Sequence, residues 1–230
     1  GRQAIAYHNY YMRHWRNNIR GSRKPLKDIC RTSIEENEIE NISFQVGVYL
    51  SAIFYTGTPF DLEDTVMEEY FEIRQQFELP ENWNIIAPYN ALMKLKGENS
   101  GLIKRKYTDT KAIQYDLFFQ MVVSVFMNDM EKAEKLNEKI FMKPGGCWGS
   151  YRLFMEGLIA THYARSTNGR SKLTYQKKAS KFIEILRTWT KVGMHNSAHM
   201  ANILKGRKYQ HKFIITTVPV NTVITQSKLL

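Results

Sequence analysis

Cysteine is scarce in this sequence of 230 residues, which contains only Cys30 and Cys147. The two lie far apart in the chain, and neither belongs to a cluster with the spacing of metal ligands. This pattern excludes a small scaffold built on disulfides and argues against a structural zinc site. It is typical of proteins in a reducing compartment, so we expect a cytoplasmic location.

Long apolar runs are also missing. The longest, around residues 46–55, is shorter than the about 20 residues that a membrane-spanning helix needs. The chain opens with "GRQAIAYHNYYMRHW", which has neither an initiator methionine nor the apolar core of a signal peptide. We therefore expect no membrane span, and a fragment of a longer protein that begins close to or inside a helix.

Acidic residues are fewer than basic ones, with 22 Asp and Glu against 33 Lys and Arg, a net charge of +11. Such an excess favours acidic partners, whether nucleic acid, anionic lipid or an acidic protein surface. However, no acidic residue follows Glu184, and the terminal segment alone supplies +4 through Arg207, Lys208, Lys212 and Lys228. The remaining +7, spread over the rest of the chain, is typical of an ordinary protein surface.

The sequence has no motif of a catalytic or phosphate-binding site. Neither "GENSGLIKRK" nor "PGGCWGS" ends on the Lys-Ser/Thr pair of a P-loop, and Ser150 lacks the Gly-x-Ser-x-Gly context of a nucleophile. Cys147 is interpreted as a structural cysteine in a turn rather than as a reactive thiol. His195 and His199 could share a helix face as metal ligands, but no third ligand accompanies them. We predict no enzymatic activity, no cofactor and no metal for this chain.

Helical patterning is abundant, and hydrophobic residues make up 43% of the chain and aromatics 13%, enough for a substantial core. Apolar residues recur at steps of three and four in most segments. The positions expected to face inward are Ile5, His8, Met12, Trp15 and Ile19; Leu26, Ile29, Cys30, Ser33 and Ile34; Leu62, Val66, Tyr70, Ile73 and Phe77; Met130, Ala133, Leu136 and Ile140; Tyr151, Phe154, Leu158 and His162; Tyr175, Ala179, Phe182, Leu186 and Trp189. Mostly buried aromatic and small positions are expected at Trp15, Phe54, Phe118, Ala133, Phe154 and Trp189.

Local signals indicate where several helices begin and end. Residues 41–59 are apolar on nearly every side and could form a strand, but their length favours a buried helix. Asp61 and Asp109 are expected to cap helices, and a helix at 82–95 should kink or break at Pro88. A tenth short helix is expected at 195–204.

One stretch, "FMNDMEKAEKLNEKIFMKPGG", carries the strongest pattern. Asn128 is predicted to cap its helix, with Glu131 as the partner in a capping box, and Pro144 with the following glycines to end it. The stretch resembles the second helix of a tetratricopeptide repeat, with Met130 at the large apolar position and Ala133 at the small one. The preceding "YDLFFQMVV" lacks the Trp and Leu-Gly spacing of the first helix of that repeat, so the pair is divergent.

A wider resemblance covers roughly residues 2–195. "AYHNYYMRHWRNNIRGSRKPLKDICRTSIEENEIENISFQVGVYLSAIFYTGTPFDL" and "MEGLIATHYARSTNGRSKLTYQKKASKFIEILRTWTKVG" resemble the helical-repeat region downstream of the P-loop ATPase module in multidomain STAND/AAA-type signalling proteins, which often end in a histidine kinase or nucleotide cyclase. The resemblance implies an all-α, tetratricopeptide-like α-solenoid of antiparallel helix pairs at residues 1–205. Residues 206–230 depart from it and are expected to form an irregular or disordered basic tail.

Two functions follow as hypotheses. The first is a non-catalytic interaction and regulatory segment of a cytosolic ATPase-coupled signalling protein, which contacts a protein partner or neighbouring domains of the same chain. The alternative is an RNA-binding helical-repeat protein, in which basic residues contact phosphates and tyrosines stack on bases. The candidate partner-binding residues are Lys104, Arg105, Lys106, Tyr107, Tyr175, Lys177, Lys178 and Lys181.

Overall fold

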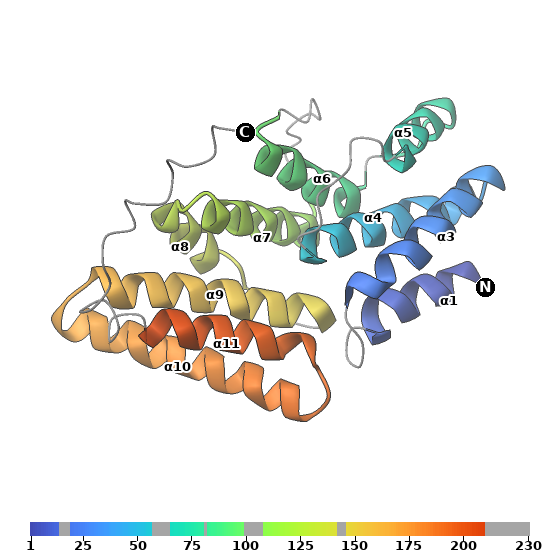
Figure 1. Ribbon diagram of the computed structural model, residues 1–230. Coiled ribbons are helices and arrows are strands. Elements are labelled where there is room, and N and C mark those ends of the chain that lie inside the picture. Colours follow the sequence, from blue (N-terminus) through green and yellow to red (C-terminus); the bar gives the residue numbers. More distant parts are fainter. Residues whose placement is uncertain (14–18, 57–64, 81, 99–107, 142–145, 210–230) are drawn as a thin grey trace, which may run out of the picture.

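The computed structural model describes residues 1–13, 19–56, 65–80, 82–98, 108–141 and 146–209. These residues form ten α-helices with short π- and 3-10-helical segments, and no β-strand occurs among them. The predicted all-α class is therefore confirmed. The helices follow one another as an array of packed neighbours, from α1 at one end to the α9–α11 layer at the other (Figure 1).

The first helix, α1 (Arg2–Tyr7), continues into a π-helical segment, η1 (His8–Met12). The prediction that Ile5 and Met12 face inward is wrong, because their side chains are 49% and 65% exposed. His8 is exposed as well. Trp15 and the side chain of Ile19, which complete that predicted stripe, lie outside the described residues.

Ala6 and Asn9 are the buried positions of this segment instead. The small side chain of Ala6 allows the helix to pack closely on its neighbours. The Asn9 amide donates to the Ile5 carbonyl, and the Ser22 hydroxyl donates to the Asn9 carbonyl. Polar groups that form hydrogen bonds in this way can be buried without a large cost in free energy. The polar side chain of Asn9 therefore does not identify the exposed face of the helix.

After a 3-10 segment, η2 (Ile19–Ser22), the chain forms α3 (Arg23–Glu35) and α4 (Ile39–Thr56). The stripe predicted for α3 is confirmed, with Ile34 half-buried and its other members buried. The helix predicted at 41–59 is confirmed as α4 as far as Thr56, and it is buried on most sides. A helix rather than a strand forms there because α4 is enclosed by α3, α5 and α6.

The next two helices are α5 (Val66–Gln76) and α6 (Trp83–Lys96). Three predicted inward residues of α5 are buried, but Phe77 is 39% exposed because the helix ends at Gln76 and the chain turns away. The predicted cap Asp61 and inward Leu62 lie outside the described residues. Asn82 caps α6, accepting from the amide of Asn84. The helix continues through Pro88 without the predicted break.

Asp109 caps α7 (Thr110–Phe126) as predicted, accepting from the Lys111 amide. The cap predicted for α8 (Met130–Glu138) is wrong: Asp129, not Asn128, accepts from the Lys132 amide. Asn128 has a positive φ of 59°, a conformation that asparagine tolerates, and its amide donates to the Val125 carbonyl. Asn128 therefore ends α7, and the capping box with Glu131 does not form.

The inward face of α8 is confirmed, since Met130, Ala133, Leu136 and Ile140 are all buried. The end of this helix is joined to α7 by Gln114, which donates to the Lys139 carbonyl and accepts from the Phe141 amide. Pro144 lies outside the described residues.

The last three helices are α9 (Gly146–Ser166), α10 (Gly169–Lys191) and α11 (Asn196–Tyr209). Only Thr167 and Asn168 separate α9 from α10, so the loop is shorter than "STNGRS". The last helix extends beyond the predicted 195–204. On α9 and α10 five members of the predicted stripes are half-buried rather than fully enclosed: Phe154, His162, Tyr175, Phe182 and Trp189.

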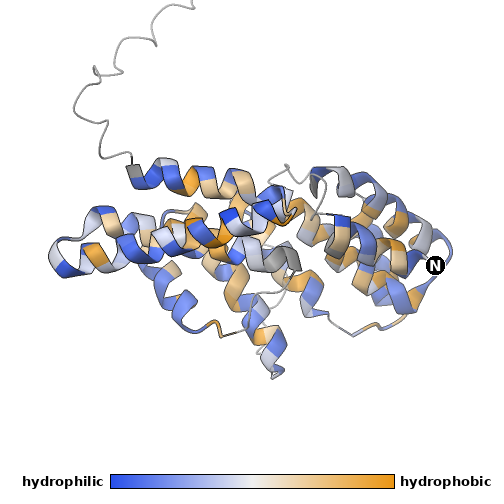
Figure 2. Ribbon diagram, turned by 90° about the horizontal axis from the view of Figure 1, so that it is seen from below, coloured by the Kyte–Doolittle hydropathy of each residue, from blue (hydrophilic) through white to orange (hydrophobic). Residues whose placement is uncertain are grey.

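Most helices pack on the next helix in sequence and several on the next but one, as α4 does on α6 and α9 on α11, whereas α5 packs on α3 and α4 rather than on α6. Apolar residues gather where helices face one another, and polar residues lie on their outer sides (Figure 2). Of the residues expected to be buried, Phe54, Phe118 and Ala133 are buried. Within the described ranges no helix has the length and apolar character to cross a membrane.

Candidate interaction surface

The positive charge of the chain is concentrated in its last three helices. Residues 146–209, which form α9–α11, contain twelve Lys and Arg against two Glu, a net +10. Residues 1–141 contain eighteen basic and twenty acidic residues, a net −2. The positive charge is therefore not spread evenly along the chain. The charge belongs to one layer of the array.

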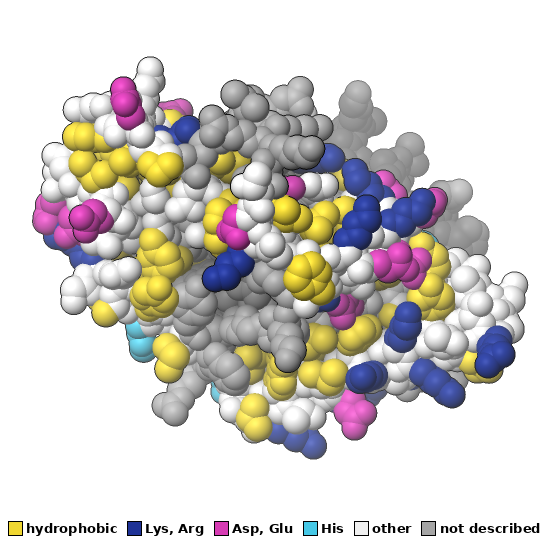
Figure 3. All heavy atoms as spheres, turned by 180° about the vertical axis from the view of Figure 1, so that it is seen from behind, with side chains coloured by type: hydrophobic (Ala, Val, Ile, Leu, Met, Phe, Trp, Pro, Cys, Tyr) yellow, Lys and Arg dark blue, Asp and Glu magenta, His cyan; other side chains and the backbone are white. Residues whose placement is uncertain are grey.

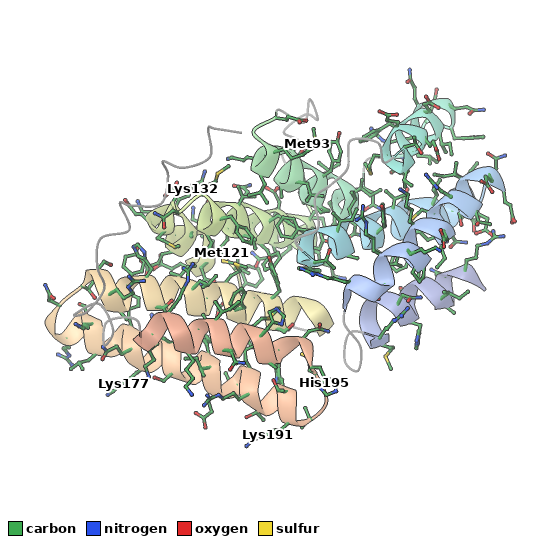
Figure 4. All side chains as sticks on the ribbon, in the orientation of Figure 1. Met93, Met121, Lys132, Lys177, Lys191 and His195 are labelled. Carbon is green, nitrogen blue, oxygen red and sulfur yellow. The ribbon has the colours of Figure 1, made fainter. Side chains whose placement is uncertain are left out.

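A row of exposed basic side chains follows the outer side of α10. Arg170, Lys177 and Lys181 are spaced seven and four residues apart, so they share the helix face opposite the buried Ala179 and Ile183. Lys177 points away from the array in Figure 4. In the view from behind, Lys and Arg side chains are spread over the lower right of the molecule, and a few Asp and Glu side chains lie near them (Figure 3).

Leu173 lies in the same row and is 59% exposed. It stands three residues after Arg170 and four before Lys177, which places it between the two cations on one face. We call Arg170, Leu173, Lys177 and Lys181 the basic row. The row thus combines three cations with one apolar side chain.

The basic row is not neutralised within the described part of the chain, where its cations form no ion pair. Of the two acidic residues in this layer, Glu156 already accepts from Arg152 at 2.8 Å. The other, Glu184, is exposed three residues after Lys181 on the same face of α10, and it forms no ion pair with the cations of the row among the described residues. The first turn of α10 has no acidic residue, although negative charge is what a helix N-terminus favours. Arg170 and Lys172 stand there instead, at some cost to the helix.

On the inner side of α10, Tyr175 joins three helices. Its hydroxyl donates to Glu134 of α8 at 2.5 Å, and its ring stacks on Tyr163 of α9 with centroids 5.0 Å apart. Lys178 lies over the same ring, with its ammonium nitrogen 5.1 Å from the centroid. The hydrogen bond to Glu134, with burial second, raises the pKa of Tyr175 to about 12. Tyr175 therefore links α8, α9 and α10, and its ring is already covered rather than available to stack on a nucleic-acid base.

A second group of cations lies where α9 and α11 end. Burial, followed by the charges of Arg165 and Arg207, lowers the pKa of the half-buried His162. Lys208 of α11 donates to the Ser180 hydroxyl of α10 at 2.7 Å. Cations at helix C-termini are favoured by the helix dipole, so this group has a structural explanation that the basic row lacks.

The structure thus brings together part of the predicted site. Lys177, Lys178 and Lys181 are exposed on α10, and Tyr175 lies beside them in its interhelical contact. Lys104, Arg105, Lys106 and Tyr107 lie outside the described residues. Arg170 and Leu173 were not predicted. The sequence signal that could have identified them is the absence of acidic residues between Glu156 and Glu184.

The described residues contain no group of three or more His, Cys, Asp or Glu side chains that could hold a metal ion. His195 is exposed in the turn between α10 and α11, and His199 is exposed on α11. Burial, and after it the charge of Arg20, lowers the pKa of His199. Ser150 is buried within α9, and the Cys147 side chain lies outside the described residues.

No protein-family model matches the chain, and no curated protein or solved structure is significantly similar to it. The residues of the chain itself therefore carry the functional argument.

Proposed function

We propose that this chain is a non-catalytic, tetratricopeptide-like interaction segment that acts within a cytoplasmic ATPase-coupled signalling protein. In such a protein, helical arrays bind a partner or a neighbouring domain and pass its engagement on to the rest of the chain. The observation that carries the proposal is that most helices pack on the next helix in sequence and several, such as α4 on α6 and α9 on α11, also on the next but one, which is how helical-repeat arrays build an elongated surface.

Ala133 supports the repeat-like character of the α7–α8 pair. Its side chain is fully buried, and the fully buried Met121 lies on the facing α7. A small residue at this position lets two helices approach closely, as the tetratricopeptide pattern requires. The resemblance of the sequence to repeat regions of ATPase-coupled proteins provides the cellular context of the proposal.

The experiment uses the full-length protein from which the segment comes. The reading frame upstream should encode a P-loop, and ATP hydrolysis should be measured with and without an in-frame deletion of residues 2–209. We expect hydrolysis to persist after the deletion but to lose its dependence on cellular partners. An upstream frame without a P-loop, or regulation unchanged by the deletion, would contradict the proposal.

RNA binding is the second candidate, and the net +10 of residues 146–209 favours it. Single-strand binding usually combines cations with aromatic rings open to the bases. On α10 the candidate ring, Tyr175, is engaged by Tyr163 and Lys178, and Trp189 is half-buried. For this reason we rank a protein partner first.

A further inference from the structure

We propose that the basic row of α10 binds an acidic amphipathic helix of a partner protein. The inference rests on the proposed interaction function and names the surface and the chemistry of the partner. It is carried by the segregation of charge, with +10 in residues 146–209 and −2 in residues 1–141.

The spacing of the row fits a helix laid along α10. Arg170 and Lys181 are eleven residues apart, which corresponds to about 16 Å along a helix axis. Three turns of a partner helix that carries Glu or Asp at steps of three and four would place a carboxylate near each cation. Long-range attraction between the two charged faces would also speed their encounter.

Leu173 decides between partner classes. An exposed leucine between cations offers an anchor for an apolar side chain, and apolar anchors surrounded by charge are typical of protein interfaces. A nucleic-acid backbone has no group that would use it. None of the described side chains of this row is aromatic, so it lacks the stacking platform of a single-strand binder.

Binding is measured by fluorescence anisotropy with the full 230-residue chain. The probe is a labelled synthetic peptide of about 14 residues that forms an amphipathic helix, with glutamates along one face around two leucines. The control peptide has glutamine in place of every glutamate. A single-stranded oligouridylate tests the nucleic-acid alternative. We expect the glutamate peptide to bind at least about tenfold more tightly than either.

Variants locate the site. Lys177→Glu with Lys181→Glu should weaken peptide binding by about tenfold or more, and Leu173→Ala by about threefold. The matched control is Lys132→Glu with Lys139→Glu on the α8 hairpin, which changes the net charge equally and should alter binding by less than about twofold. All four lysines are exposed. If the charge-reversed protein loses helicity, Lys177→Ala with Lys181→Ala provides the same comparison.

Three results would overturn the inference. They are an absence of peptide binding, an equal loss in the α8 control, or oligouridylate binding at least as tight as that of the peptide. None of them bears on whether residues 2–209 regulate ATP hydrolysis in the full-length protein. The two proposals can therefore fail separately.

Discussion

Gly47 of α4 lies directly against the backbone carbonyl of Asn84 on α6. A β-carbon added to Gly47 would lie 3.1 Å from that carbonyl oxygen and 3.0 Å from the Asn84 β-carbon. The residue four positions after Asn84 is Pro88, which has no N–H to donate to this carbonyl. The absence of a side chain at one position thus permits two helices to approach closely, at the turn where a proline stands inside one of them.

Gly47→Ala should destabilise the protein by about 1–2 kcal/mol, because backbone atoms of α6 cannot move aside as a flexible side chain could. The comparison is Gly206→Ala on α11, where an added β-carbon meets nothing within 4 Å. That change should stabilise by up to about 1 kcal/mol through helix propensity. Urea unfolding of both variants measures the contrast. Equal effects at the two glycines would mean that α4 and α6 do not approach as described.

Ala133→Phe should destabilise by about 1–3 kcal/mol, since a large ring at a fully buried position forces α7 and α8 apart. The neighbouring Lys132 is exposed, and Lys132→Phe should change the free energy of unfolding by less than about 0.5 kcal/mol. Thermal unfolding followed by circular dichroism compares the two. A neutral Ala133→Phe would refute the repeat-like reading of the α7–α8 pair.

Gln45→Met should stabilise the protein by about 1–2 kcal/mol. Gln45 is 1% exposed, and neither atom of its amide forms a hydrogen bond within the described structure. A methionine of similar length removes the desolvated amide while it keeps the volume.

Gln114→Met is the matched control for this change. Gln114 is also buried, but its amide satisfies the Lys139 carbonyl and the Phe141 amide, so the same substitution should destabilise by about 2–3 kcal/mol. The midpoints of denaturant unfolding, compared at an unchanged m value, measure the change in the free energy of unfolding for both variants. A loss of stability in Gln45→Met comparable to that of Gln114→Met would show that Gln45 has a bonding partner of its own.

The Tyr175–Glu134 hydrogen bond predicts a decline in stability at alkaline pH. Because the folded pKa is about 12 and the ordinary value is near 10, the unfolded chain releases the phenol proton first. The unfolded state then binds fewer protons, so this contribution is complete below pH 10 and is lost as the pH rises toward 12.

Tyr175→Phe should remove this part of the pH dependence and destabilise the protein near neutral pH by about 1 kcal/mol. Unfolding curves across alkaline pH, together with phenolate absorbance, compare the variant with the original chain. A double-mutant cycle with Glu134→Gln isolates the pair. Identical alkaline profiles for the two proteins would exclude the bond.

Much of the fold could be predicted from local pattern. The caps Asn82 and Asp109 lie just before apolar periodic segments, and their side chains bond the first amides of the same helices. The apolar length of α4 predicted a buried helix. These features depend on residues within a turn or two of one another, so the sequence carries them directly.

The candidate surface was only partly predictable. The three lysines of α10 were identified by composition, but Arg170 and Leu173 join them only once the helix has a defined outer face. Tyr175 was expected to be open for stacking, and its bond to Glu134 spans 41 positions of the chain. No local pattern reports such a contact.

The sequence alone therefore determined the all-α class, most helix positions and the excess of positive charge, because each arises from composition or from short-range periodicity. Only the tertiary structure decided that Ala6 and Asn9, rather than Ile5 and Met12, are buried, and that the basic row stands unpaired among the described residues on one outer layer. Periodicity marks the possible faces of a helix. Which face is buried depends on the helices that pack against it, and these are distant in sequence.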